Sequence, residues 1–213
     1  MSTCTFYATS PKLNEFMDET TARSPITEFI LQSERNLRVA RAVYSEWEGA
    51  KGELGKEFCN RLSAILMKKL PGWECDNWDF LISKHGGFSM WKPEWADQYY
   101  VHLKALDFGE TMTYGILRIE SNASMAKRPF SPDLLYAVKN RIDSAKGNKK
   151  WWEVVMDLHE PDSDWSKPEV LWQMKTSDVF LERVASQLLE LAALSEKIVD
   201  TQVAKYSGKA KKK

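Results

Sequence analysis

Residues 98–120 read QYYVHLKALDFGETMTYGILRIE and hold the clearest strand pattern in the chain. Between 98 and 106 the side chains alternate in character, which is the period of a strand with one buried face. Residues 107–110 supply a short turn, and 112–120 supply the return strand. The segment therefore predicts an antiparallel hairpin. Its predicted core-facing row is Tyr99, Val101, Leu103 and Ala105.

The other row of this hairpin is the first candidate binding surface. Tyr100, His102 and Lys104 are predicted to point to the outer face of the sheet. An exposed histidine on a strand is either simply solvated or takes part in recognition. In the second case these three side chains form a strip that stacks on a ligand and donates hydrogen bonds to it.

Two helices are predicted before the hairpin. Ser24-Pro25 is a favourable helix start, because serine can cap the free amides and proline fits the first helical position. Gly49 and Gly52 are expected to end this helix, and a second helix is expected from about Leu54 to the stop at Pro71-Gly72. Each helix has an apolar stripe that predicts core packing. The first stripe comprises Phe29, Ile30, Leu37, Ala40, Val43, Tyr44 and Trp47, and the second comprises Leu54, Phe58, Leu62, Ile65 and Leu66.

Two further helices are predicted after the hairpin. Ser131-Pro132-Asp133 has a cap, a proline and an acidic residue in the favoured positions, and Gly147 is the expected stop. Ser177 or Asp178 is expected to cap a long final amphipathic helix. The predicted fold class is therefore α+β: an antiparallel sheet built on a central hairpin and packed by amphipathic helices, with N-terminal helices and a long C-terminal helix.

Length and composition indicate one globular domain. The 213 residues suffice for one core, and the 43% apolar and 28% charged fractions are typical of globular proteins. Residues 1–23 lack a period and are predicted to be a flexible arm. Residues 24–203 are predicted to form a single α+β domain, and 204–213, with five lysines, a disordered basic tail.

Charge and cysteine content indicate a cytoplasmic protein. The charges of thirty basic and thirty acidic residues cancel, so the chain lacks the basic surplus of a general nucleic-acid binder. The sum is still compatible with a local basic patch. No apolar run approaches the roughly 20 residues that a bilayer requires, and the N-terminus lacks a signal-peptide pattern. Three irregularly spaced cysteines fit a reducing compartment. We therefore expect no membrane association.

The motifs of metal sites and common enzymes are missing. The three histidines are widely separated, unlike zinc ligands. The segment 162–173 begins like a calcium loop but has Lys167 at the glycine position and Gln173 at the glutamate position. Phosphate-binding glycine loops, nucleophile elbows and zinc-protease helices do not occur. Cys75 and His102 could still lie close together in the folded chain and form a catalytic dyad. We predict no metal, no cofactor and no catalytic residue.

Nine tryptophans are a high number for this length. Each indole combines a large apolar surface with one N–H donor. Tryptophans such as Trp91 and Trp95 either anchor irregular segments to the sheet, the role that we favour, or line an aromatic groove for a peptide or an unstacked base. Lys149 and Lys150, beside Trp151-Trp152, are candidate phosphate contacts.

The order of these features over roughly residues 55 to 200 resembles the C-terminal half of certain bacterial PD-(D/E)XK nuclease-superfamily proteins. The residues that carry this resemblance are Trp73 and Trp78, Lys92-Pro93-Glu94-Trp95, Tyr114-Gly115-Ile116, Trp151-Trp152, Asp164-Trp165 and the final helix. Those nucleases hold Mg²⁺ with acidic residues, one of them two positions before a lysine. Here no lysine has Asp or Glu two positions earlier; Lys104, for example, follows His102. The resemblance therefore implies an accessory domain without an active site, whose partner or ancestor handles nucleic acid.

Three hypotheses follow. The first is a non-catalytic interaction module of the intracellular bacterial or phage type that binds a protein. The second is a nucleic-acid-binding accessory domain in which Lys149, Lys150, Lys205, Lys209 and the terminal lysines contact phosphates. The third is an enzyme whose dispersed residues leave no sequence motif. The absence of catalytic motifs favours the first.

Overall fold

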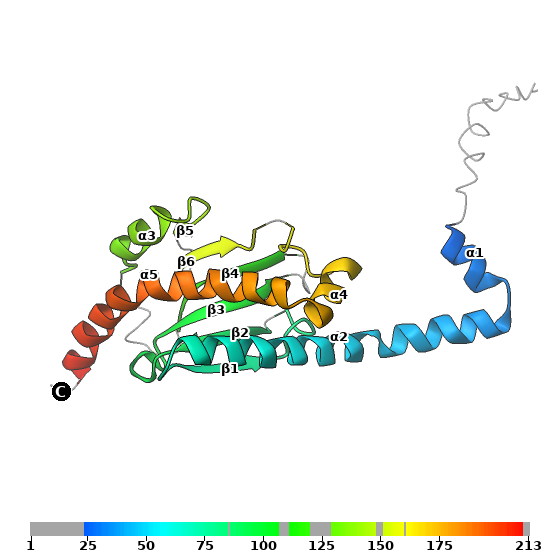
Figure 1. Cartoon of the computed structure of the whole chain (residues 1–213), viewed down its shortest axis with the longest axis horizontal. Helices are drawn as coiled ribbons and strands as arrows, with labels where there is room; N and C mark the ends of the chain where they lie inside the picture. Colours follow the sequence, from blue (N-terminus) through cyan, green and yellow to red (C-terminus); the bar gives the residue numbers. More distant parts are fainter. Residues whose placement is uncertain are drawn as a thin grey trace, which may run out of the picture. The chain divides into compact units, whose positions relative to one another are not determined.

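The computed structural model has an α+β fold (Figure 1). The chain divides into two compact units, with the division between Trp47 and Glu48. The predicted single domain, 24–203, includes parts of both units, and the predicted arm, 1–23, lies outside the described residues. The structure describes residues 24–84, 86–106, 111–119, 129–147, 151–159 and 161–210.

The first unit contains two described helical segments: α1 (Pro25–Leu31) and the start of α2 (Glu34–Lys69). α1 begins at the predicted cap, because the Ser24 hydroxyl accepts a hydrogen bond from the Thr27 amide at 3.2 Å. In the same way, the Ser33 hydroxyl accepts from the Asn36 amide at 3.1 Å at the start of α2. Capping serines therefore set the start of both helices.

The prediction that Gly49 and Gly52 end a helix is wrong, because α2 continues through both. A glycine within a helix costs only about 1 kcal/mol relative to alanine. The glycines also let α2 approach a neighbouring loop closely. A Cβ on Gly52 would lie 3.3 Å from Ile82 Cγ2, and a Cβ on Gly55 would lie 2.8 Å from the Phe80 backbone oxygen.

The second unit is built on a six-stranded antiparallel sheet with the order β1-β2-β3-β4-β6-β5. The predicted hairpin is confirmed and lies at its centre, since every residue of β3 has a partner in β4, from Tyr99 with Arg118 to Leu106 with Thr111. The strands are β1 (Glu74–Trp78), β2 (Gly87–Trp91), β3 (Tyr99–Leu106), β4 (Thr111–Arg118), β5 (Lys146–Gly147) and β6 (Trp152–Asp157).

The remaining helices are α3 (Pro132–Lys139), α4 (Pro168–Thr176) and α5 (Asp178–Ala210), together with a short 3₁₀ helix, η2 (Pro93–Trp95). α3 begins at the predicted Ser131 cap, but it ends before Asn140 rather than at Gly147, which lies in β5. Ser177 caps α5 as predicted, because its hydroxyl accepts from the Phe180 amide at 3.1 Å. In the described part of the chain, no helix is both long and apolar enough to cross a membrane.

α5 continues to Ala210, which lies within the predicted tail at 204–213. Alanine and lysine are strong helix formers, so this segment can extend a helix that tertiary packing has already established. The end of the predicted tail, 211–213, lies outside the described residues.

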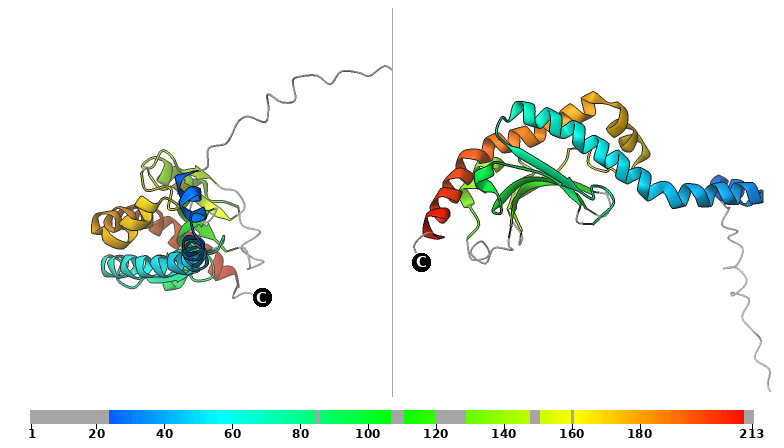
Figure 2. Two further views of the ribbon diagram at one scale, coloured as in Figure 1. Left: turned by 90° about the vertical axis from the view of Figure 1, so that its right-hand side faces the viewer. Right: turned by 90° about the horizontal axis from the view of Figure 1, so that it is seen from below.

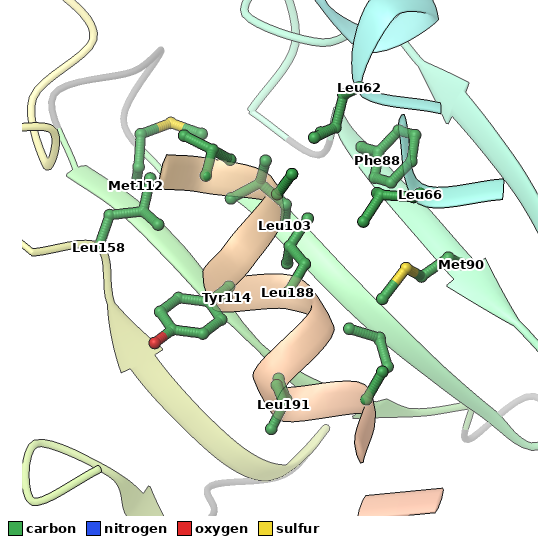
Figure 3. Close-up of a cluster of buried hydrophobic side chains, with 14 of the residues drawn as sticks. Leu62, Leu66, Phe88, Met90, Leu103, Met112, Tyr114, Leu158, Leu188 and Leu191 are labelled. Carbon is green, nitrogen blue, oxygen red and sulfur yellow. The ribbon is translucent and has the colours of Figure 1, made fainter. Parts of the chain in front are cut away.

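The core lies between the sheet and two helices. α5 and the part of α2 in this unit cover one face of the sheet (Figure 2), and side chains from both helices interdigitate with the central strands (Figure 3). The predicted inward row of β3 is confirmed as fully buried. Figure 3 shows members of this core: Leu62 and Leu66 of α2, Phe88 and Met90 of β2, Leu103 of β3, Tyr114 of β4, and Leu188 and Leu191 of α5.

The two predicted apolar stripes of the N-terminal region differ in burial. Most of the second stripe is buried as predicted, including Phe58, Leu62 and Leu66. The prediction of core packing for the first stripe is wrong, since Tyr44 is 84% exposed and Val43 is 62% exposed. Within the first unit only α1 and the start of α2 are described, and two short helices cannot cover each other's whole apolar surface.

Two glycines of α2 provide a test of this packing. We expect Gly55→Ala to destabilise the protein by about 1–3 kcal/mol, because the added Cβ would force α2 away from the Phe80 backbone. Gly49→Ala has open space around the new Cβ and should stabilise the helix by about 1 kcal/mol. Urea unfolding of both variants measures the two changes, and equal signs would contradict this description of α2.

Candidate binding site

The sheet has one face that no described helix lies across (Figure 2). We call the side chains on this side of the central strands the open face. Strand alternation and ring contacts assign its members. They are Glu74, Asp76, Trp78, Ser89, Trp91, Tyr100, His102, Lys104, Thr113, Leu117, Trp152, Val155 and Asp157.

His102 lies at the centre of the open face but is only 2% exposed. Its ring stacks on Trp78, with the centroids 5.4 Å apart, and contacts Trp152 at 5.6 Å. The prediction of an exposed histidine is therefore wrong, because two indoles from other strands cover the ring. Neighbouring glycines make the necessary space: a Cβ on Gly87 would lie 2.4 Å from His102 Cε1, and one on Gly115 would lie 2.9 Å from the Trp152 ring.

Burial determines the chemistry of His102. Desolvation, followed by the nearby charge of Lys104, lowers its pKa to about 3, against a weaker opposing effect of a hydrogen bond with the Phe88 backbone. The imidazole is therefore neutral at physiological pH. Its Nδ1 lies 2.7 Å from the Ser89 hydroxyl. Ser89 is 1% exposed, so a substrate could not reach this hydroxyl without displacing an indole, and the pair fixes β2 to β3 rather than forming a catalytic dyad.

Lys104 is the cation of the open face. Partial burial lowers its pKa, and the positive charge of Lys84 lowers it further. In the part of the chain that the structure describes, no carboxylate forms an ion pair with Lys104. An anion placed here would relieve the repulsion between the two lysines.

Thr113 lies directly opposite Lys104 on β4. The residue is 4% exposed, and its Oγ1 has no hydrogen-bond partner among the described residues. A buried hydroxyl without a partner costs roughly 1–3 kcal/mol. Among the described residues Lys104 therefore has no acidic partner, and its partly exposed ammonium is suited to a carboxylate of a ligand, whereas the Thr113 hydroxyl, like that of Ser89, is too buried to reach one.

Trp91 and Tyr100 form the second aromatic group of the open face. Their rings meet edge to face with the centroids 5.0 Å apart. Trp91 Nε1 donates to Glu74 Oε2 at 3.1 Å, and burial is the main cause that raises the pKa of Tyr100. Both side chains are partly exposed. The predicted strip and Trp91 thus lie on one face, although its central member is buried.

Trp95 does not belong to this site. It is fully buried beside Trp73 and donates its indole N–H to Asp200 Oδ1 of α5 at 2.7 Å. Lys92 Nζ contacts the other oxygen of Asp200 at 2.9 Å. Its burial and this hydrogen bond fit the anchoring role favoured for the tryptophans, with Trp95 holding α5 to the β2–β3 connection. The predicted phosphate contacts Lys149 and Lys150 lie outside the described residues.

Trp78, Trp152 and Thr113 were not identified from the sequence as site residues. Each belongs to a strand whose alternation is consistent with the open face. Sequence periodicity predicts which side of a strand a residue takes, but it does not predict which strands are neighbours. Identifying these residues required the pairing of β1 with β2 and of β6 with β4, which the sequence does not provide.

Two other predicted sites can be compared with the structure. Cys75 points to the helix-covered side, where its Sγ lies 2.8 Å from Ser63 Oγ, so it does not meet His102. Asp162 of the calcium-like segment forms a bidentate ion pair with Arg183, at 2.7 and 2.8 Å. Among the described residues no group of three or more His, Cys, Asp or Glu could hold a metal ion.

The buried histidine makes stability depend on pH. Unfolded His102 binds a proton near pH 6.5, whereas the folded residue binds one only near pH 3, so between these values the unfolded state holds more protons. The free energy of unfolding should therefore fall on acidification through this window, by up to about 1.4 kcal/mol per pH unit from this residue. Urea unfolding between pH 7 and pH 4 measures the slope.

His102→Gln is the matched variant, because glutamine retains hydrogen-bonding groups but does not titrate. At pH 7 the variant should be less stable than the wild type, and this difference should shrink steadily as the pH falls. A difference that stays constant from pH 7 to pH 4 would show that His102 is not buried in its neutral form.

Comparisons with known proteins complete the description of the site. No protein-family model, curated protein or solved structure matches this chain. The resemblance to the C-terminal half of PD-(D/E)XK nuclease-superfamily proteins therefore stays a prediction from the sequence, and the open face is the basis for assigning a function.

Proposed function

We propose that this chain is a non-catalytic protein-binding module whose open face binds an extended segment of a partner protein. Apolar side chains of that segment pack on the indoles of Trp78 and Trp152, and one carboxylate contacts Lys104. The observation that carries this proposal is the group of aromatic rings around His102, on the same row of β3 as Lys104, which has no acidic partner among the described residues.

The aromatic side chains have the properties of interface residues. Trp and Tyr are enriched where binding energy is concentrated, because they bury a large area with few rotatable bonds. Trp78 is 40% exposed, and its ring is held by stacking on the buried His102. Side chains that are already fixed lose little conformational entropy on binding, and this supports a preformed binding surface.

The charges favour a protein over a nucleic acid. Glu74, Asp76 and Asp157 are exposed on the strands that carry the open face. Three carboxylates would repel a phosphate backbone, which requires a basic surface. A protein segment with one acidic residue carries far less negative charge than a phosphate backbone, so the same carboxylates oppose its binding less, and its one carboxylate can pair with Lys104. Stacking of unpaired bases on the tryptophans is the alternative that the experiment must exclude.

A displayed library of random dodecapeptides, selected on the immobilised protein, tests this proposal. We expect the selected peptides to share an acidic residue flanked by apolar or aromatic residues. Lys104→Glu should weaken their binding at least tenfold, because attraction of the peptide carboxylate becomes repulsion. Trp78→Ala should have an effect of similar size, typical of an aromatic residue at the centre of an interface. Tryptophan fluorescence titration measures both dissociation constants.

Trp172→Ala is the control, because Trp172 is 65% exposed but lies on α4, away from the open face. This variant should bind the peptides like the wild type, and circular dichroism should show that all three variants are folded. Unchanged peptide binding by both Lys104→Glu and Trp78→Ala would overturn the proposal. Binding of labelled oligothymidylate that weakens steeply with salt, without any selected peptide, would favour the nucleic-acid alternative.

A further inference from the structure

The first unit has an apolar groove that the open face does not explain. Between α1 and α2 lies a cavity of about 420 Å³. A contiguous exposed apolar surface of this kind is typical of a site that binds another protein surface. Six large side chains that line the groove are exposed: Ile26, Phe29, Val39, Val43, Tyr44 and Trp47.

The groove is built to stay open. The Asn36 side-chain amide donates to the Phe29 carbonyl at 2.7 Å and so ties α2 to α1. Along α2 the lining residues Asn36, Ala40, Val43 and Trp47 follow one another at intervals of four, three and four residues. This is the spacing of a helix that packs lengthwise against another helix. The occupant that fits is therefore an α-helix with an apolar stripe.

The spacing also indicates which helix fits. The groove-lining residues of α2 have the same intervals of four, three and four whether they are counted from the N-terminal or the C-terminal end. An antiparallel copy of α2 therefore presents its groove residues at the same intervals. Arg35 and Glu46 lie eleven residues apart, close to three full turns, and hence on the same flank of α2. Neither forms an ion pair with another described residue.

Antiparallel pairing places Arg35 of each copy near Glu46 of the other, because a two-fold axis across the helices brings identical flanks together at opposite ends. In a parallel pair the flank that carries Arg35 and Glu46 would instead face the opposite flank of the other copy, so these two residues would not meet each other. We propose that two copies of this chain associate through the groove between α1 and α2, with their α2 helices antiparallel. This surface belongs to the first unit, so the proposal does not depend on the function assigned to the open face.

Sedimentation equilibrium of the full chain tests the pairing. The expected mass is twice the 24.6 kDa of one chain. Tyr44→Glu, which places a charge in the groove, should give a monomer. Tyr136→Glu is the matched control, since Tyr136 is 70% exposed on α3 and should leave the dimer intact. A wild-type chain that stays monomeric at millimolar concentration would overturn the proposal and would leave a different protein as the occupant of the groove.

Charge reversal tests the antiparallel orientation. Arg35→Glu and Glu46→Arg should each raise the dimer dissociation constant at least tenfold, because each creates two like-charge contacts per dimer. A mixture of the two variants should recover the dimer, since both contacts in the mixed pair join opposite charges. The recovery should diminish at 0.5 M salt. A mixture no more associated than either variant alone would overturn antiparallel pairing. Peptide binding by the monomeric Tyr44→Glu variant reports on the open face alone, so the two proposals can fail separately.

Discussion

Burial of His102 is the constraint on which the second unit depends. β3 is covered on one side by α2 and α5 and, at its centre, by two indoles on the other. An imidazole in such a place must be neutral and hydrogen-bonded, and the Ser89 hydroxyl meets this requirement at 2.7 Å. Gly87 and Gly115 provide the space, since a side chain at either position would collide with the histidine or with Trp152.

The same constraint determines what the open face can do. The His102 ring contacts the indoles of Trp78 and Trp152, and these contacts fix the positions of both indoles before any ligand binds. A neutral, inaccessible histidine is unsuited to proton transfer with a substrate, because its low pKa and its burial both oppose it. His102 therefore supplies no general acid or base on this face. Among the described residues of this face, the accessible charges are those of Lys104, Glu74, Asp76 and Asp157.

Local sequence signals predicted the local structure well. The Ser24, Ser131 and Ser177 caps and the β3–β4 hairpin depend on residues within a few positions of one another, and the sequence pattern is sufficient for these. The exposure of His102 could not be predicted, because the indoles that cover it come from strands distant in the chain. The first apolar stripe was assigned to a core for a related reason: periodicity indicates that a face will be covered, but not whether the same molecule covers it.

The two proposed binding surfaces lie in different units, and their separation affects the affinity for a partner. If two chains associate through the first unit, each pair carries two open faces. A partner with two suitable segments would then bind the second face as an intramolecular event, at an effective concentration that the linkage sets. A modest contact with one carboxylate and a few indoles can thus yield tight binding without a large interface. Loss of pairing would weaken such a partner strongly while leaving the affinity of a single segment for one open face unchanged.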